Sequence, residues 1–149
     1  MANAQLFMLA KWEKEKEDKA ARDFQQAQLF VDQNKAKLEG LENYRLEYFR
    51  QIQQRGATEG LEAKSFNQHQ GFITKLDKAC EQQRQVIHNA VLAAEQRRDI
   101  LTEQQKKRRA VEMLIAKKQK LQLAKEAKIE QAMMDEVALQ RYIRQPKVM

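Results

Sequence analysis

The stretch RGATEGL, residues 55–61, decides how this chain folds, because it holds two of the four glycines in 149 residues. All four glycines lie between residues 40 and 71, and the single proline is Pro146. Glycine and proline are the residues least compatible with the interior of a helix. A chain that confines them in this way is expected to form two very long helices joined near residues 55–61.

The composition indicates a helical chain with a thin core. Charged residues make up 33% of the chain, and glutamine alone occupies 21 positions. No apolar run approaches the roughly 18–20 residues that are needed to cross a bilayer. The one cysteine, Cys80, cannot form an internal disulfide, and no signal peptide opens the sequence. We therefore expect a cytoplasmic protein.

Apolar residues follow a heptad repeat before the glycines. Ten of the fourteen positions that step by four and three from Leu6 to Ile52 are apolar, which is the pattern of a coiled-coil seam. A second, less regular repeat runs from Ile73 to Ile143, where thirteen of 21 such positions are apolar. Polar residues such as Gln83 interrupt it, so the register of the seam is open to shifts along this helix.

Two helices around one break predict an all-α fold, a long antiparallel two-helix coiled-coil hairpin whose second helix is longer than the first. The expected single domain, 1–149, has a helix at about 2–54, a turn at about 55–62, a helix at about 63–142 and a tail at 143–149. Gly56 is expected to end the first helix in a left-handed conformation and Thr58 to cap the second, with Gly60 as the other candidate for the reversal. The alternative is one continuous rod of about 140 residues that dimerises in parallel, because each glycine costs a helix only ~1 kcal/mol.

The unequal helix lengths leave part of the second helix without an intrachain partner. Folding at residues 57–61 places residue 3 opposite about residue 115, so 117–142 extends beyond the first helix. The apolar stripe of this overhang consists of Leu121, Ala124, Ile129, Ala132, Met133, Leu139 and Ile143. A long helix with an uncovered apolar stripe is expected to bind another chain.

Few residues suggest chemistry. His69 and His88 lack carboxylates or thiols at metal-ligand spacing, and we expect both on the solvated surface. Cys80 falls on the seam and is expected to be a small buried residue. The sequence has no glycine-rich phosphate loop and no nucleophile elbow. It predicts a protein that is not an enzyme and uses no metal or cofactor.

Basic residues gather late in the chain. Residues 95–128 carry eleven basic and five acidic side chains, which accounts for nearly all of the net charge of +7. The predicted basic face consists of Lys106, Lys107, Arg108, Arg109, Lys117 and Lys118. Its candidate partners are nucleic acid, acidic lipid and an acidic protein groove, and the alternative is a solvated helix surface. Aromatic residues that would stack on bases are absent from 73–141, so a nucleic-acid-binding coiled coil is the second hypothesis.

Half of the ten aromatic residues lie between positions 44 and 72, on both sides of the expected turn. Because a two-helix hairpin buries only a narrow stripe of each helix, Tyr44, Phe72 and Ala79 are expected to form a partly exposed apolar patch beside the seam. Tyrosine and phenylalanine are efficient interface residues, so we interpret this patch as a binding surface. Thicker packing near the turn is the alternative.

The sequence resembles the FliJ family, the small coiled-coil proteins of the flagellar type III export apparatus. The resemblance rests on the order of YRLEY (44–48), FITKLDKACEQQR (72–84) and EQAMMDE (130–136) in a basic chain of 149 residues. The chain differs from the family pattern at Leu101, where tryptophan is frequent, and at Cys80, where an aliphatic residue is usual.

The resemblance implies a non-enzymatic role in flagellum biogenesis and motility. The family's helical ends, about residues 1–25 and 115–145, insert into the export ATPase hexamer in the manner of a rotary-ATPase central stalk. The surface near the turn docks on the cytoplasmic domain of the export gate membrane protein, and the family also handles export chaperones. The implied location is cytoplasmic, with peripheral association with the inner membrane.

By matching position, the resemblance assigns two sets of residues. The expected gate-binding set is Lys37, Leu41, Tyr44, Tyr48, Phe72, Leu76, Ala79 and Gln83. The expected ATPase contacts on the C-terminal overhang are Ile129, Gln131, Met133, Asp135, Glu136 and Leu139.

Overall fold

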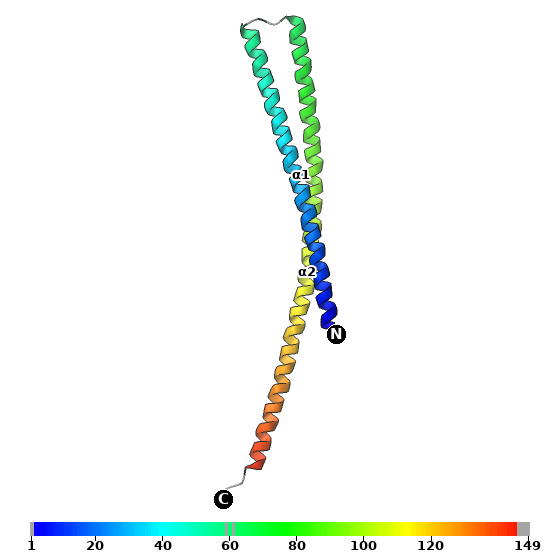
Figure 1. The fold of residues 1–149 in the computed structure, drawn as a ribbon, viewed down its shortest axis with the longest axis vertical. Coiled ribbons are helices and arrows are strands. Elements are labelled where there is room, and N and C mark those ends of the chain that lie inside the picture. The colour runs from blue at the N-terminus through cyan, green and yellow to red at the C-terminus, as the bar shows by residue number, and fades with distance from the viewer. Residues whose placement is uncertain (1, 59, 61, 146–149) are drawn as a thin grey trace. The chain divides into compact units, whose positions relative to one another are not determined.

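Two helices make up the computed structural model, which describes residues 2–58, 60 and 62–145 (Figure 1). Helix α1 spans Ala2–Thr58 and α2 spans Ala63–Arg144. The longer α2 packs against α1 as a hairpin, and the described residues contain no strand. The predicted all-α hairpin is confirmed, and the alternative of one continuous rod is wrong.

The seam between the helices follows the predicted heptads. All fourteen predicted positions of α1, from Leu6 to Ile52, are buried or half-buried. On α2 the same holds for every predicted position from Ile73 to Ile115 except Arg97. The long charged side chain of Arg97 extends into solvent instead. The seam is therefore narrow, as expected for two helices that bury one stripe each.

The larger of two compact units covers residues 17–104, and its centre is apolar but thin. Val31 of α1 packs with Ala90 and Ala94 of α2, and Ala27 and Val91 surround them. Small side chains dominate this cluster, so each contact buries little area and stability has to accumulate along the length of the seam.

Next along the seam is a buried amide pair. The Gln83 Nε2 group donates to the Asn34 backbone oxygen at 3.0 Å and to Asn34 Oδ1 at 2.8 Å. Cys80, one step closer to the turn, has only 2% of its surface exposed and is a free thiol. The predicted role of Cys80 as a small seam residue is confirmed.

The second unit combines residues 1–16 with 105–149. Leu6, Ala10 and Glu13 of α1 are buried or half-buried in it, as are Val111 and Ile115 of α2. From 116 to 145 every residue is exposed. Figure 1 shows no other helix beside this last part of α2, drawn in orange and red. The predicted overhang is confirmed.

The turn is shorter than predicted. Helix α1 continues through Gly56 and ends at Thr58, so Gly56 is not a left-handed terminal residue and Thr58 does not cap α2. Gly60 has a φ of 71° and makes the reversal. At the start of α2 the Phe66 N–H donates to the Glu62 backbone oxygen at 3.0 Å.

The turn falls at Gly60 because a glycine inside a helix costs less free energy than a non-glycine residue at positive φ. Gly56 weakens the helix by only ~1 kcal/mol, whereas a side chain at Gly60 would add a steric cost of about 1–2 kcal/mol. At the other end α2 reaches Arg144 instead of residue 142, and residues 146–149 of the expected tail lie outside the described residues.

We predict opposite effects for two alanine substitutions. Gly60→Ala is expected to destabilise the hairpin by about 1–2 kcal/mol, because alanine is strained at positive φ. Gly56→Ala is expected to stabilise it by up to ~1 kcal/mol, because alanine favours the helix. Urea unfolding followed by circular dichroism measures both changes. Equal effects, or the reverse order, would contradict the assignment of the turn to Gly60.

Candidate functional site

Three rings from both helices meet near the turn. The Tyr48 and Phe72 ring centroids are 4.7 Å apart, and the Tyr44 and Phe72 rings meet edge to face at 6.4 Å. Tyr48 is half-buried on the seam, whereas Tyr44 is 52% exposed. The two helices therefore bring together aromatic residues that lie more than twenty positions apart in the sequence. The result is a cluster with a buried base and an exposed rim.

His69 belongs to the same cluster. Its Nδ1 atom is hydrogen-bonded to the Tyr48 hydroxyl at 2.5 Å, and the two ring centroids are 5.7 Å apart. The ring is half-buried, so the expectation that His69 is a solvated surface residue is wrong. The cause is the partner on α1, which spacing within α2 alone does not reveal. His88, in contrast, is exposed as expected.

The expected gate-binding set divides into exposed and buried members. Lys37, Tyr44 and Phe72 are exposed, and Phe72 has the smaller exposed fraction of the two aromatic members, 36%. Leu41, Tyr48 and Ala79 are half-buried. Leu76 and Gln83 are buried on the seam and present almost no surface. Any direct contact with a partner therefore falls on the first group, and the buried members support it from below.

The opposite side of the hairpin near the turn carries ion pairs. Arg84 contacts Glu42 across the seam at 3.1 Å and Glu81 on its own helix at 3.3 Å. Hydrogen bonds to Glu42 and then Glu81 raise the pKa of Arg84, which stays charged. Arg45 pairs with Asp77, also across the seam. The ion pairs therefore lie on one side of the seam, and the cluster of Tyr44, Tyr48 and Phe72 lies on the other.

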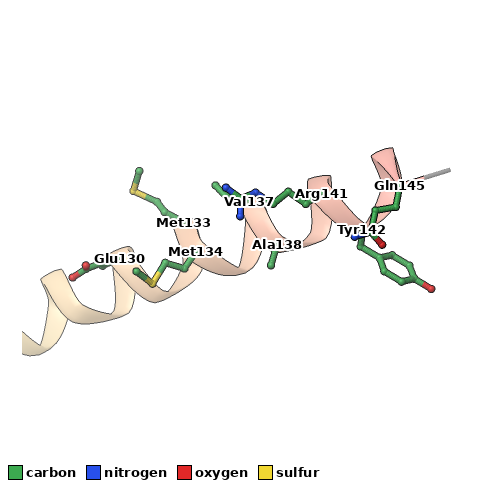
Figure 2. A pocket seen from close by; sticks show the side chains of 8 residues that line it. All are labelled: Glu130, Met133, Met134, Val137, Ala138, Arg141, Tyr142 and Gln145. Atoms are coloured by element: carbon green, nitrogen blue, oxygen red, sulfur yellow. The ribbon is translucent and has the colours of Figure 1, made fainter.

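The C-terminal overhang presents a second candidate surface, an open apolar face on a single helix (Figure 2). All six expected ATPase contacts on it are exposed. Met133 is 65% exposed and Leu139 57%, while Gln131 Nε2 donates to Asp135 Oδ1 at 3.2 Å along the helix. No second helix in the described structure covers these side chains. They are available to another chain.

Apolar side chains surround this part of α2 instead of forming one stripe. Nine of the fifteen residues of 129–143 are apolar, and at about 100° per residue they point in every direction around the axis. Figure 2 shows Met134, Ala138 and Tyr142 along one side and Met133 along another. The expected set omitted Met134, Val137 and Tyr142. The sequence signal for these three residues is that apolar side chains occur on every side of the helix in 129–143.

The basic residues likewise surround the helix. Lys106, Lys107, Arg108 and Arg109 are consecutive, so they point in four directions and do not line one face. Arg108 is half-buried and pairs with Glu112 at 2.8 Å. The other five members of the predicted basic set are exposed. A flat acidic surface would meet only some of these charges at once.

Two kinds of site, a metal centre and a membrane-spanning helix, are absent from the described part of the chain. No group of three or more His, Cys, Asp and Glu side chains among these residues lies close enough together to hold a metal ion. Likewise, none of the described helical segments is apolar over a length that would cross a membrane. The candidate sites are thus two surfaces, the aromatic cluster and the overhang.

Comparison with known proteins identifies the chain's family. A family model described as the flagellar FliJ protein matches residues 1–147, almost the whole chain. No curated protein and no solved structure matches it. The family match agrees with the resemblance in the three motifs, and it implies a part in flagellar protein export. The chain belongs to the FliJ family and is a component of the flagellar export apparatus.

Proposed function

We propose that this chain is the central stalk of the export ATPase ring and couples that ring to the export gate. In this proposal the overhang of α2 and the N-terminal part of α1 lie in the hexamer, and the aromatic cluster near the turn docks on the cytoplasmic domain of the gate membrane protein. The protein would act in the cytoplasm, next to the inner membrane. Family membership supports the general role, and the handling of export chaperones is a further expectation from the family.

The overhang carries the proposal. Thirty consecutive residues, 116–145, are helical or directly follow the helix and bury nothing in this chain. A helix with apolar residues on all sides is typically buried on all sides. One neighbouring helix would cover a single stripe and leave the rest in water. An enclosing partner, such as the bore of a ring, covers every side at once.

The aromatic cluster supports the second half of the proposal. Its rim of Tyr44 and Phe72 is exposed, while Tyr48 and His69 hold its base by a hydrogen bond and ring contacts. A preformed aromatic surface loses little conformational entropy on binding, which is why Tyr is frequent among the residues that dominate binding energy. The opposite side carries the ion pairs of Arg84 with Glu42 and of Arg45 with Asp77 instead.

We predict that a chain truncated after Ala116 loses its effect on the ATPase. The full-length chain is expected to promote hexamer assembly, because the missing residues 117–149 include the surface that the ring would enclose. Since 117–145 buries nothing within the chain, the melting temperature of the truncated hairpin should change little. Sedimentation of the ATPase with each chain measures hexamer formation.

A charge placed in the overhang gives the matched test. Met133→Glu should weaken ring binding by about tenfold, whereas Gln119→Glu, which adds the same charge on an exposed site of the same helix, should have little effect. The stalk proposal is wrong if the full-length chain does not change hexamer assembly, or if truncation leaves that effect intact.

For the gate, we predict that Tyr48→Ala and Phe72→Ala each weaken binding of the gate's cytoplasmic domain by about tenfold or more, because Phe72 is an exposed aromatic anchor and Tyr48 supports it from below. Tyr48→Phe serves as the control. It keeps the ring and loses the hydroxyl that bonds His69, so stability should fall by about 1 kcal/mol while binding is retained. Titration calorimetry and thermal melts separate the two effects. A large fall in melting temperature for the alanine variants, with unchanged binding, would show that the cluster is only core.

A further inference from the structure

Apolar residues continue along one side of the hairpin beyond the cluster near the turn. In heptad notation, Val31 and Cys80 occupy a positions of α1 and α2. The g positions of the larger unit are then Asp23, Phe30, Lys37, Tyr44 and Gln51 on α1, and Ser65, Phe72, Ala79, Val86, Ala93 and Ile100 on α2. We call the middle part of these columns, Phe30, Lys37, Tyr44, Phe72, Ala79 and Val86, the g strip. Five of its six residues are apolar or aromatic.

The two columns of the g strip lie side by side. In an antiparallel pair the g positions of the two helices face each other, and Tyr44 and Phe72 do so in their edge-to-face contact. Moving two heptads away from the turn along each helix places Phe30 opposite Val86. Phe30 is 52% exposed and Val86 40%. The exposed aromatic surface near the turn is therefore one end of a longer strip.

Most of the matching e positions on the other side of the seam are polar, with Phe49 and Val91 as apolar members. The polar members include Glu42, Asp77 and Arg84, which form the ion pairs across the seam. A helix that is apolar only at a and d is typical of a two-stranded coiled coil. A helix that is also apolar at the neighbouring e or g positions is typical of a bundle with more than two helices. The hairpin has the second pattern on its g side only.

We propose that one amphipathic helix of the gate's cytoplasmic domain lies along the g strip and forms a three-helix bundle with α1 and α2. The inference rests on the proposed docking at the aromatic cluster and extends it to Phe30 and Val86. A helix fits the strip because the apolar residues repeat every seven positions on both columns, which is the period of another helix in a coiled coil.

The borders of the strip limit the width of its occupant. The c positions that flank it are Gln26, Gln33, Gly40 and Glu47 on α1, and Gln68, Lys75, Gln82 and Asn89 on α2. The apolar surface is therefore one residue wide on each helix, the width that a single helix covers. A second copy of this chain fits less well, because a two-fold pairing centred on the strip would bring two Lys37 side chains together.

Gly40 marks the point of closest approach. It lies inside α1, where glycine costs ~1 kcal/mol relative to alanine, yet an added Cβ would meet nothing within 4 Å. The fold itself gives no reason for glycine there. Gly40 borders the strip beside Lys37 and Tyr44, so a partner backbone that approaches α1 there accounts for the missing side chain.

Two substitutions with matched controls test this proposal. Gly40→Gln should raise the melting temperature, because glutamine favours helix, and yet weaken binding of the gate's cytoplasmic domain by about tenfold. Gly71→Gln is the control. Gly71 is also helical with open space around it, but it lies at an f position away from the strip, so binding should stay unchanged.

Phe30→Ala and Phe49→Ala form the second pair. Both rings are exposed, at 52% and 42%, but Phe49 lies at an e position on the other side. Only Phe30→Ala should weaken binding, by about fivefold to tenfold. Hydrogen exchange in the complex should then protect one continuous segment of the gate domain.

Four results would overturn the inference. If each variant loses as much binding as its control, the g strip is not the docking surface. The proposed function would still stand in that case if Tyr48→Ala and Phe72→Ala lose binding. Protection of several separate segments would exclude a single helix. A dimer of the chain alone that Phe30→Ala converts to monomers would make a second copy the occupant. If the unaltered chain does not bind the gate domain at all, the proposed coupling and this extension both fail.

Discussion

The whole structure depends on one constraint: each helix can bury only one stripe, and only against the other helix. Helix α1 ends at Thr58 and runs back no further than Ala2, so it covers α2 only as far as Ile115. In the described part of the chain the apolar residues beyond that point are exposed, and the apolar residues that flank the stripe are exposed or half-buried. A compact globular domain would have folded such residues inside. In a two-helix chain they are left for partners.

The seam and the helix lengths could be predicted because they are periodic. A seven-residue repeat combines the weak apolar preference of many single positions into one clear pattern. Polar residues such as Gln83 and Gln104 on the seam did not hide this pattern. The turn could not be predicted to the residue. Gly56 and Gly60 look alike in the sequence, and the choice depends on a difference of about 1 kcal/mol between glycine in a helix and another residue at positive φ.

The site was only partly predictable for a different reason. The rings of Tyr44 and Phe72 could be placed beside the seam from their heptad positions alone. The bond between Tyr48 and His69 depends on pairing across the seam. Periodicity within one helix contains no information about which residue of the other helix lies opposite. That information requires the register, which the position of the turn and the polar residues of the seam decide together.

The amide pair of Asn34 and Gln83 is one of the polar contacts that favour this register. Apolar seam residues such as Ala27, Ala90 and Ala94 are similar in size, so sliding one helix by a heptad would change their packing little. The same slide would separate Gln83 from both oxygens of Asn34 and leave buried amide groups unpaired, at about 1–3 kcal/mol each. A polar residue on the seam that fixes register at a cost in stability is a known property of coiled coils. In this chain the fixed register also decides that Phe72 faces Tyr44. The amide pair on the seam therefore helps to set the arrangement of the exposed aromatic surface, although it does not contact that surface.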